Sequence, residues 1–146
     1  MDSSNVKSAA IPCLCHALRQ ASRAASRLYD DELRGAGLRT TQFSVLRVLA
    51  AQGEIRQRDL AERTVHEETT LTRNLRPLVE AGWVAERPGN DRREKWLKIT
   101  PEGLSKLKVA RPLWQRAQQR MRSQLSEEVW ENLLTVLPEV ARKAAK

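Results

Sequence analysis

Two cysteines and a histidine near the start of the chain are the residues best suited to chemistry of their own. Cys13 and Cys15 are the only cysteines among 146 residues, and His16 follows directly. On a helix, residues two apart point about 200° apart, so the two thiols would face different directions, whereas Cys13 and His16 would share a face. A metal chelate, a redox switch and an inert, packed helix start are the three interpretations.

Zinc is the weakest of these. Structural zinc sites take four ligands at typical spacings, and the one further histidine, His66, lies in a different part of the chain. Soft thiophilic ions such as arsenite or Cu(I), held by thiolates from two chains, stay open. A thiol in the first turn of a helix is stabilised as a thiolate by the dipole and is reactive where exposed. Two interpretations therefore remain open: redox sensing, and packing of both cysteines as small hydrophobes.

Threonines and cations form a second set of residues with binding chemistry. They are Thr69, Thr70, Thr72, Arg73 and Arg76, followed later by Arg92, Arg93 and Lys95 beside Asp91. Arginine can pair bidentately with guanine, and threonine can donate to a phosphate or pack its methyl group on thymine. Glu67 and Glu68 repel phosphate, so they must point away from a DNA backbone or accept from cytosine.

The charge of the chain favours a polyanionic partner only weakly. The net charge is +8, from 26 Lys and Arg against 18 Asp and Glu, yet residues 54–98 hold ten basic and nine acidic residues. The excess lies mainly in residues 106–122, which hold six basic residues and no acid. No apolar run is long enough to span a bilayer, no secretion leader is visible, and two cysteines this close build no disulfide framework. We expect a cytoplasmic protein without membrane contact.

Hydrophobic periodicity predicts the elements that position these residues. A helix from Pro12 to the Gly35-Ala36-Gly37 break carries one apolar stripe, and a second, capped by Thr40, ends near Gly53. "RQRDLAERTV" and "EETTLTRNLRPLVEAGW" predict two more helices, joined by a tight turn near Val65–His66 and closed by Gly82. The inward positions of the second helix are Phe43, Val45, Leu46 and Leu49.

A change of period marks a β-hairpin. "WVAER" and "EKWLKIT" are short extended runs on either side of "PGNDRR", a turn with a cationic tip. Thr100 then caps a helix that runs to about Gln124, and Ser126 starts a last helix that Pro138 should kink or end early.

These elements predict a mainly α fold: a winged helix-turn-helix over residues 36–100, with a two-stranded β wing. Residues 11–35 and 101–146 are predicted to be dimerisation helices, because their apolar stripes have no cover inside so small a domain, and residues 1–10 a disordered tail. Pairing of two copies would place two reading helices about one DNA turn apart.

Two stretches resemble the multiple-antibiotic-resistance regulator (MarR) family of transcription factors. "DLAERTVHEETTLTRNLRPLVEAGWV" is similar to its helix-turn-helix, and "DRREKWLKITPEG" to its wing pattern. The resemblance implies that Arg93 enters the minor groove, that Asp91 braces it by an ion pair, and that Arg92 and Lys95 contact phosphates. Pro77, inside the reading helix, departs from the pattern and is expected to remove a backbone donor and bend the axis.

The N-terminus also resembles the organic-hydroperoxide-sensing (OhrR) branch of that family. The resemblance implies that Cys15 is the peroxidatic cysteine and that Tyr29 corresponds to a tyrosine reaching from the other subunit. The second tyrosine expected near "TQF" is replaced by Thr40.

The sequence therefore predicts a dimeric repressor that binds double-stranded DNA at a palindromic operator. Oxidation of Cys15, with Cys13 as a second candidate, or a small aromatic or lipophilic inducer would release it. The alternatives are a regulator responsive to thiophilic metals and a winged-helix adaptor that binds protein instead of DNA. We expect no cofactor, and no enzyme activity, since the chain lacks a glycine-rich phosphate loop and clustered carboxylates or histidines.

Overall fold

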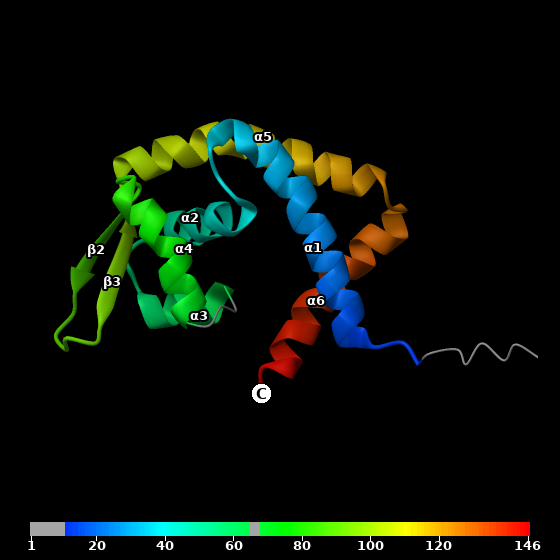
Figure 1. Cartoon of the computed structure of the whole chain (residues 1–146), viewed down its shortest axis with the longest axis horizontal. Coiled ribbons are helices and arrows are strands. Elements are labelled where there is room, and N and C mark those ends of the chain that lie inside the picture. Colours follow the sequence, from blue (N-terminus) through cyan, green and yellow to red (C-terminus); the bar gives the residue numbers. More distant parts are fainter. Residues whose placement is uncertain (1–10, 65–67) are drawn as a thin grey trace, which may run out of the picture.

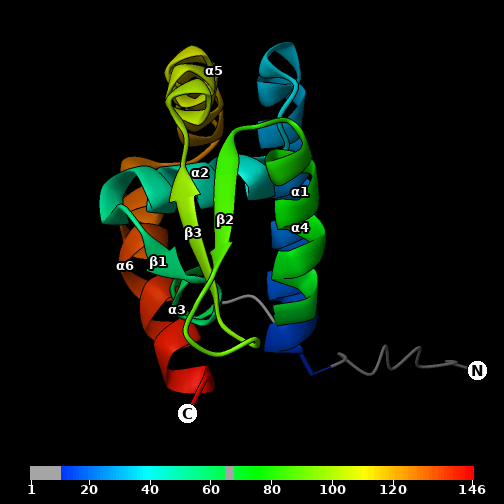
Figure 2. The ribbon, with the colours of Figure 1, turned by 90° about the vertical axis from the view of Figure 1, so that its left-hand side faces the viewer.

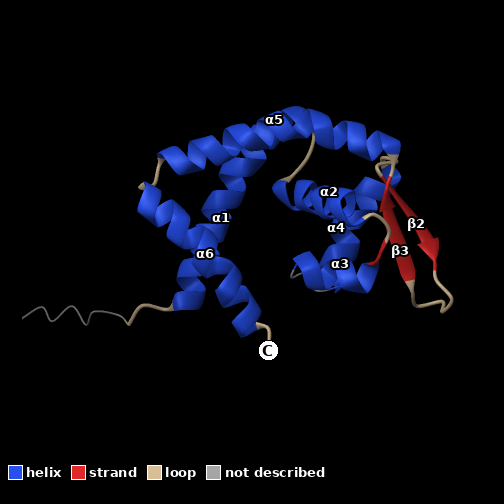
Figure 3. Ribbon diagram, turned by 180° about the vertical axis from the view of Figure 1, so that it is seen from behind, coloured by secondary structure: helices blue, strands red, loops and turns tan. Residues whose placement is uncertain are grey.

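Six α-helices and a small sheet make up residues 11–64 and 68–146, which the computed structural model describes. In chain order they are α1 (Leu14–Leu33), a 3-10 helix η1 (Arg34–Ala36), α2 (Thr40–Gln52), β1 (Ile55–Arg56), α3 (Gln57–Thr64), α4 (Glu68–Glu80), β2 (Val84–Pro88), β3 (Lys95–Ile99), α5 (Pro101–Ser123) and α6 (Glu127–Ala144). Helix α5 runs from the unit built from α2–α4 and the sheet, at one end, to the start of α6 at the other, and α1 packs against it on the way (Figure 1). Figure 3 shows from behind that the strands lie only in the first of these parts.

Leucines form the core of the winged unit. Leu46 of α2, Leu60 of α3, Leu71 of α4 and Leu97 of β3 are completely buried against one another. All four inward positions predicted for α2 are buried, which confirms the periodicity of that helix. Leu33 at the end of α1 joins the same core, so α1 is fastened to the winged unit at its C-terminal end.

The sheet has three antiparallel strands in the order β1-β3-β2, as Figure 2 shows. The predicted hairpin is present, with Val84 opposite Ile99 and Pro88 opposite Lys95. Strand β1, which pairs Ile55 with Leu97 and Arg56 with Trp96, was not predicted. It turns the wing from a free hairpin into part of a sheet that is anchored beside α3.

Two of the three predicted helix caps are confirmed and one is wrong. Thr100 accepts from the Gly103 N–H at 3.0 Å, and Ser126 accepts from the Val129 N–H at 3.2 Å. Thr40, by contrast, is the first residue of α2 and not its cap. Its N–H donates to the Asp30 carboxylate of α1 at 2.7 Å. The carboxylate of a residue ten positions upstream thus satisfies one of the free N–H groups at the start of α2, and the cap position is held by Arg39.

Prolines do not interrupt the helices that contain them. Pro77 lies within α4 and Pro138 within α6, which continues to Ala144. Of the two outcomes predicted for Pro138, an early end of the helix is therefore wrong, and a kink stays a prediction. Both prolines lie on exposed faces.

Two predictions fall on residues outside the described ranges: the disordered tail at residues 1–10, and the turn near Val65–His66 together with Glu67. Among the described helices, none combines the length and apolarity needed to cross a membrane.

Candidate nucleic-acid interface

Helix α4 presents the threonines and arginines that the sequence singled out. Its buried side is formed by Leu71, Leu75 and Leu78. The opposite side is exposed and carries Thr69, Thr70, Thr72, Arg73 and Arg76. The structure thus gathers all five predicted residues on the solvent side of one helix. Because α4 is amphipathic, the burial of its leucines is enough to turn the threonine and arginine side chains toward solvent.

Thr72 is linked to α3 through a residue that the sequence did not single out. Gln57 donates from Nε2 to the Thr72 hydroxyl at 2.8 Å, and that hydroxyl donates to the Glu68 carbonyl at 2.8 Å. The contact joins the first residue of α3 to the exposed face of α4. Contacts that Thr72 makes beyond the helix-turn-helix must therefore use its methyl group or the remaining lone pair.

Arg76 is partly neutralised by its own helix. Its Nε lies 3.0 Å from Glu80 Oε1, one turn further on, and both side chains are largely exposed. Arg73 has no acidic partner within ion-pair distance among the residues that the structure describes. The exposed pair of Arg76 with Glu80 contributes about 0.3–0.5 kcal/mol to the stability of the fold. Arg76 can therefore leave Glu80 for a phosphate at little cost.

The wing tip is organised differently from the prediction. Asp91 accepts from the backbone N–H of Arg93 at 3.2 Å, and no ion pair joins the two side chains within the described part of the chain. Asp91 therefore shapes the turn through the backbone and leaves the Arg93 guanidinium free of its carboxylate. Arg92, Arg93 and Lys95 are all exposed.

Arg56, on β1, is a further cation of this region that was not predicted. It lies 3.0 Å from Asp59 of α3 and 3.3 Å from Glu94 of the wing. The hydrogen bonds that Arg56 donates to these carboxylates, that to Asp59 first, raise the pKa of Arg56 above its ordinary value. No sequence signal marks this residue, because a strand of two residues has no periodicity.

A surface hollow of about 560 Å³ lies between the helix-turn-helix and the wing. Glu68 and Thr72 line it from α4, Gln57 from α3, and Arg93 and Lys95 from the wing. Two clusters that are some twenty residues apart in the sequence thus open onto one concave, mainly polar surface. Its polar lining, with four basic side chains against three acidic ones, suits a charged partner better than an apolar metabolite.

Comparison with known proteins agrees with this arrangement. A family model described as the MarR family matches residues 36–94. A transcriptional regulator of Bacillus subtilis, YwoH, is 34% identical over 93 residues, which are 64% of this chain and 68% of that protein. The transcriptional regulator MosR of M. tuberculosis in complex with DNA has a TM-score of 0.82 and 33% identity, with 92% of this chain and 97% of that chain covered.

A variant of E. coli MarR in complex with operator DNA has a TM-score of 0.76 and 26% identity over 87% of this chain and 92% of that one. This chain belongs to the MarR family. It is accordingly a transcriptional regulator with a winged helix-turn-helix and is not an enzyme.

In this MarR-family regulator, both cysteines lie at the exposed start of α1. Cys13 is the extended residue that precedes the helix, and Cys15 lies in its first turn, which holds no acidic residue. Both are free thiols. Within the described residues, no group of three or more His, Cys, Asp and Glu side chains is arranged around a common point as metal ligands would be.

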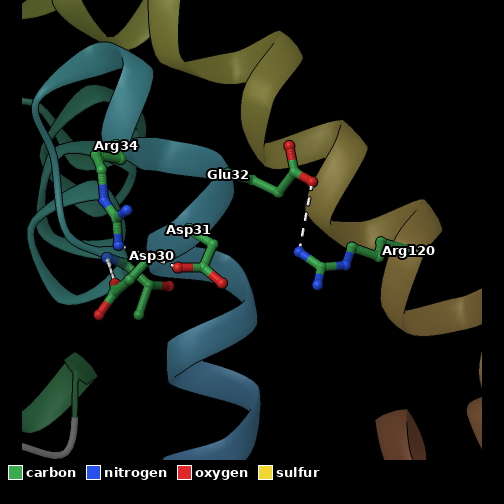
Figure 4. Close-up of polar contacts among 6 residues, drawn as sticks. Asp30, Asp31, Glu32, Arg34 and Arg120 are labelled. Atoms are coloured by element: carbon green, nitrogen blue, oxygen red, sulfur yellow. Dashed lines mark hydrogen bonds and ion pairs between the residues drawn. The ribbon is translucent and has the colours of Figure 1, made fainter.

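Tyr29 is half-buried between α1 and α5, and its hydroxyl donates to the Gln118 side chain of the same chain. Burial raises the pKa of Tyr29. A neighbouring link, from Glu32 to Arg120 at 3.7 Å, also joins α1 to α5 (Figure 4). The tyrosine expected to serve another subunit is thus already bonded within its own chain.

Proposed function

We propose that this regulator binds duplex DNA with α4 in the major groove and the wing tip at the adjacent minor groove. The observation that carries the proposal is the shared hollow, onto which Thr72 of α4 and Arg93 of the wing both open. A helix fits the width of the major groove, and a β-hairpin beside it meets the neighbouring backbone. Thr69, Thr70, Thr72, Arg73 and Arg76 would contact bases and nearby phosphates, Arg93 the minor groove, and Arg92 and Lys95 phosphates.

The proposal includes a homodimer held by α1, α5 and α6. Helix α6 makes only sparse contacts with the rest of the described chain. Its apolar side chains are left partly exposed, including Leu133, Leu134, Val136 and Leu137, and Leu14 at the start of α1 is 65% exposed. Apolar residues that recur along one helix side are normally covered, and a second copy offers the same surface in return.

A two-fold assembly implies a two-fold target. Two α4 helices that face the same side of a dimer would engage half-sites about one turn, roughly 34 Å, apart. The operator is therefore proposed to be palindromic. The proposal is completed by a repressor role, in which occupation of such a site within a promoter would block transcription.

Binding to DNA is tested with a duplex selected by the wild-type protein from a random-sequence pool. We expect a palindromic consensus, an affinity that falls steeply with salt, and a smaller salt slope for Arg93→Ala. Failure to enrich any duplex, or an affinity independent of salt, would contradict the function and favour a protein-binding adaptor. Lys143→Ala, on α6, is the matched control for loss of one exposed cation.

The dimer is tested by sedimentation. Leu133→Glu with Leu137→Glu should convert a micromolar dimer into a folded monomer that binds the selected duplex weakly, because the charges would have to be buried. Leu104→Glu changes a more exposed leucine in the first turn of α5, at the end that adjoins the wing and lies away from α6, and should leave the dimer intact. A wild-type monomer at this concentration would contradict the assembly.

We assign release from DNA to oxidation of Cys15, since its thiol is exposed at the positive end of α1. The thiolate attacks a hydroperoxide oxygen, which gives a sulfenic acid and expels an alcohol or water. A second thiol, Cys13 or a cysteine of another chain, then displaces hydroxide to form a disulfide. If Cys15→Ser binds the duplex and is still released fully by peroxide, this assignment is wrong.

An inducer molecule is the second candidate for release. A hollow of about 480 Å³ beside α2 is lined by Val48 and Ala51 together with Arg47 and Arg63. Apolar walls with two cations suit a small aromatic acid. Release of the Cys13→Ser, Cys15→Ser double variant by such a compound, but not by peroxide, would favour this route.

A further inference from the structure

One tryptophan on the wing lies between two arginine side chains. Arg56 on β1 and Arg87 on β2 are the direct cross-strand neighbours of Trp96 on β3. The guanidinium carbons of Arg56 and Arg87 lie 5.9 Å and 5.1 Å from the centroid of the tryptophan ring. Both distances fall within the range in which a cation is attracted by an aromatic face. The ring therefore links the two outer strands through the central one.

Each of these arginines is also held by carboxylates. Arg87 pairs with Glu54, which directly precedes β1. Arg56 pairs with Asp59 of α3 at 3.0 Å and with Glu94 of the wing at 3.3 Å. The six residues Glu54, Arg56, Asp59, Arg87, Glu94 and Trp96, here called the wing brace, thus tie α3 to all three strands.

Glu94 connects the wing brace to the wing tip. It directly follows Arg93, its carbonyl accepts from the Gly89 N–H at 2.7 Å, and its own N–H donates to the Asp91 carbonyl at 2.9 Å. A Cβ on Gly89 would overlap with the Glu94 side chain. The Glu94 carboxylate is therefore packed over the turn that carries Arg93, so a movement of Glu94 must move the tip.

We infer that the wing brace sets the position of the wing tip relative to α4, and that Trp96 and Glu94 are positioning residues for DNA recognition. An isolated two-stranded hairpin is marginally stable in water, so the direction of its tip needs an anchor. Asp59 supplies that anchor on α3, and Gln57 of α3 is bonded to Thr72 of α4. Through these contacts, the wing tip and the reading face are attached to the same short helix.

The brace consists of exposed interactions that reinforce one another. Arg56 is 45% exposed and Glu94 29% exposed, so each ion pair alone contributes little. Trp96 contacts both arginines, and Arg56 is shared by two carboxylates, so removal of Trp96 takes one contact from each guanidinium group at once. The inference rests on the proposed function, in which α4 and the wing engage one duplex together.

The test compares Trp96→Ala, Trp96→Phe and Glu94→Gln with the wild type on the selected duplex. We expect Trp96→Ala to bind about ten-fold more weakly, to lose hydroxyl-radical protection of the minor groove, and to retain guanine protection in the major groove. Trp96→Phe, which keeps an aromatic face, should restore most of the minor-groove protection. Lys106→Ala is the matched control, since it removes a cation 4.9 Å from a different ring, that of Trp83.

Amide hydrogen exchange of the free protein tests the structural effect of the wing brace independently of DNA binding. Backbone amides of residues 85–95 should exchange faster in Trp96→Ala and Glu94→Gln, whereas those of α4 should be unchanged. Unchanged exchange together with an unchanged footprint would overturn the brace and leave the proposed function standing. If the wild type selects no duplex, the proposed function is wrong. The role of Trp96 and Glu94 in DNA recognition is then wrong too, whatever the exchange data show.

Discussion

Gln57 donates its side-chain amide to the hydroxyl of Thr72 at 2.8 Å and thereby fastens the first residue of α3 to the exposed face of α4. The same hydroxyl donates to the Glu68 carbonyl. Thr72 therefore serves two purposes, since it holds the angle between the two helices and lies where a DNA base or phosphate would approach.

This contact predicts a measurable loss of stability. Thr72→Val keeps the branched shape of the side chain but removes both bonds, and should lower the free energy of unfolding by about 0.5–1.5 kcal/mol in urea titrations. Thr135→Val is the control, because the Thr135 hydroxyl bonds, within the described part of the chain, only to the Glu131 carbonyl of its own helix. Equal effects of the two substitutions would show that the Gln57 bond contributes nothing.

The pair of Arg76 with Glu80 predicts that Glu80 weakens binding to DNA, because it competes with phosphate for the guanidinium group. Glu80→Gln frees the guanidinium for a phosphate, so binding to non-specific duplex should strengthen and the salt slope should steepen by about one ion. Glu139→Gln, which breaks the equivalent pair with Lys143 on α6, should change neither quantity. A salt slope unaltered by Glu80→Gln would mean that Arg76 does not contact DNA.

The helices of this fold could be predicted from the sequence because their signals are local. The apolar spacing around Phe43 and Leu46 fixes the buried side of α2, and Thr100 with Pro101 marks the start of α5 within three residues. The same periodicity placed the threonines and arginines of α4 together on one exposed side. For these elements, each residue that decides the structure lies within a turn or two of the residue it affects.

The remaining features depend on partners that only the folded chain brings together. Asp30, ten residues upstream, accepts from a free N–H at the start of α2, where the sequence expected Thr40 to be the cap. Strand β1 is defined by its pairing with Leu97 and Trp96 and not by any pattern of its own. The placement of Arg56 and Arg87 on either side of Trp96 requires the register of three strands. A two-residue strand carries too little sequence to predict that register.

The two hydrogen bonds of the Thr100 hydroxyl predict a contribution to stability where the wing meets α5. Its hydroxyl donates to the Gly82 carbonyl at 2.6 Å and accepts from the Gly103 N–H at 3.0 Å. Thr100→Val should therefore cost about 1–2 kcal/mol of unfolding free energy, whereas Thr100→Ser should cost much less. Ser126→Ala is the reference, since it removes a cap with a single bond. A loss for Thr100→Val no greater than for Ser126→Ala would show that the Gly82 bond is without effect.

Tyr29 predicts a stability that falls in alkaline solution. Burial raises the pKa of this phenol above the ordinary value of 10.0, so the folded state holds the proton more tightly than the unfolded state. The contribution is complete below pH 10 and is lost as the pH rises from 10 through the folded pKa, since the unfolded chain ionises first. The ionised oxygen also loses the proton that it donates to Gln118.

Because Tyr29 is the only tyrosine, its titration can be followed directly by tyrosinate absorbance. We expect a midpoint above 10 in the folded protein and an ordinary midpoint in denaturant. Tyr29→Phe should remove the corresponding part of the stability loss measured by urea titration on either side of pH 10, while the lysines continue to titrate in both proteins. A folded midpoint at or below 10 would mean that the hydroxyl is open to solvent and that α1 and α5 separate at this point.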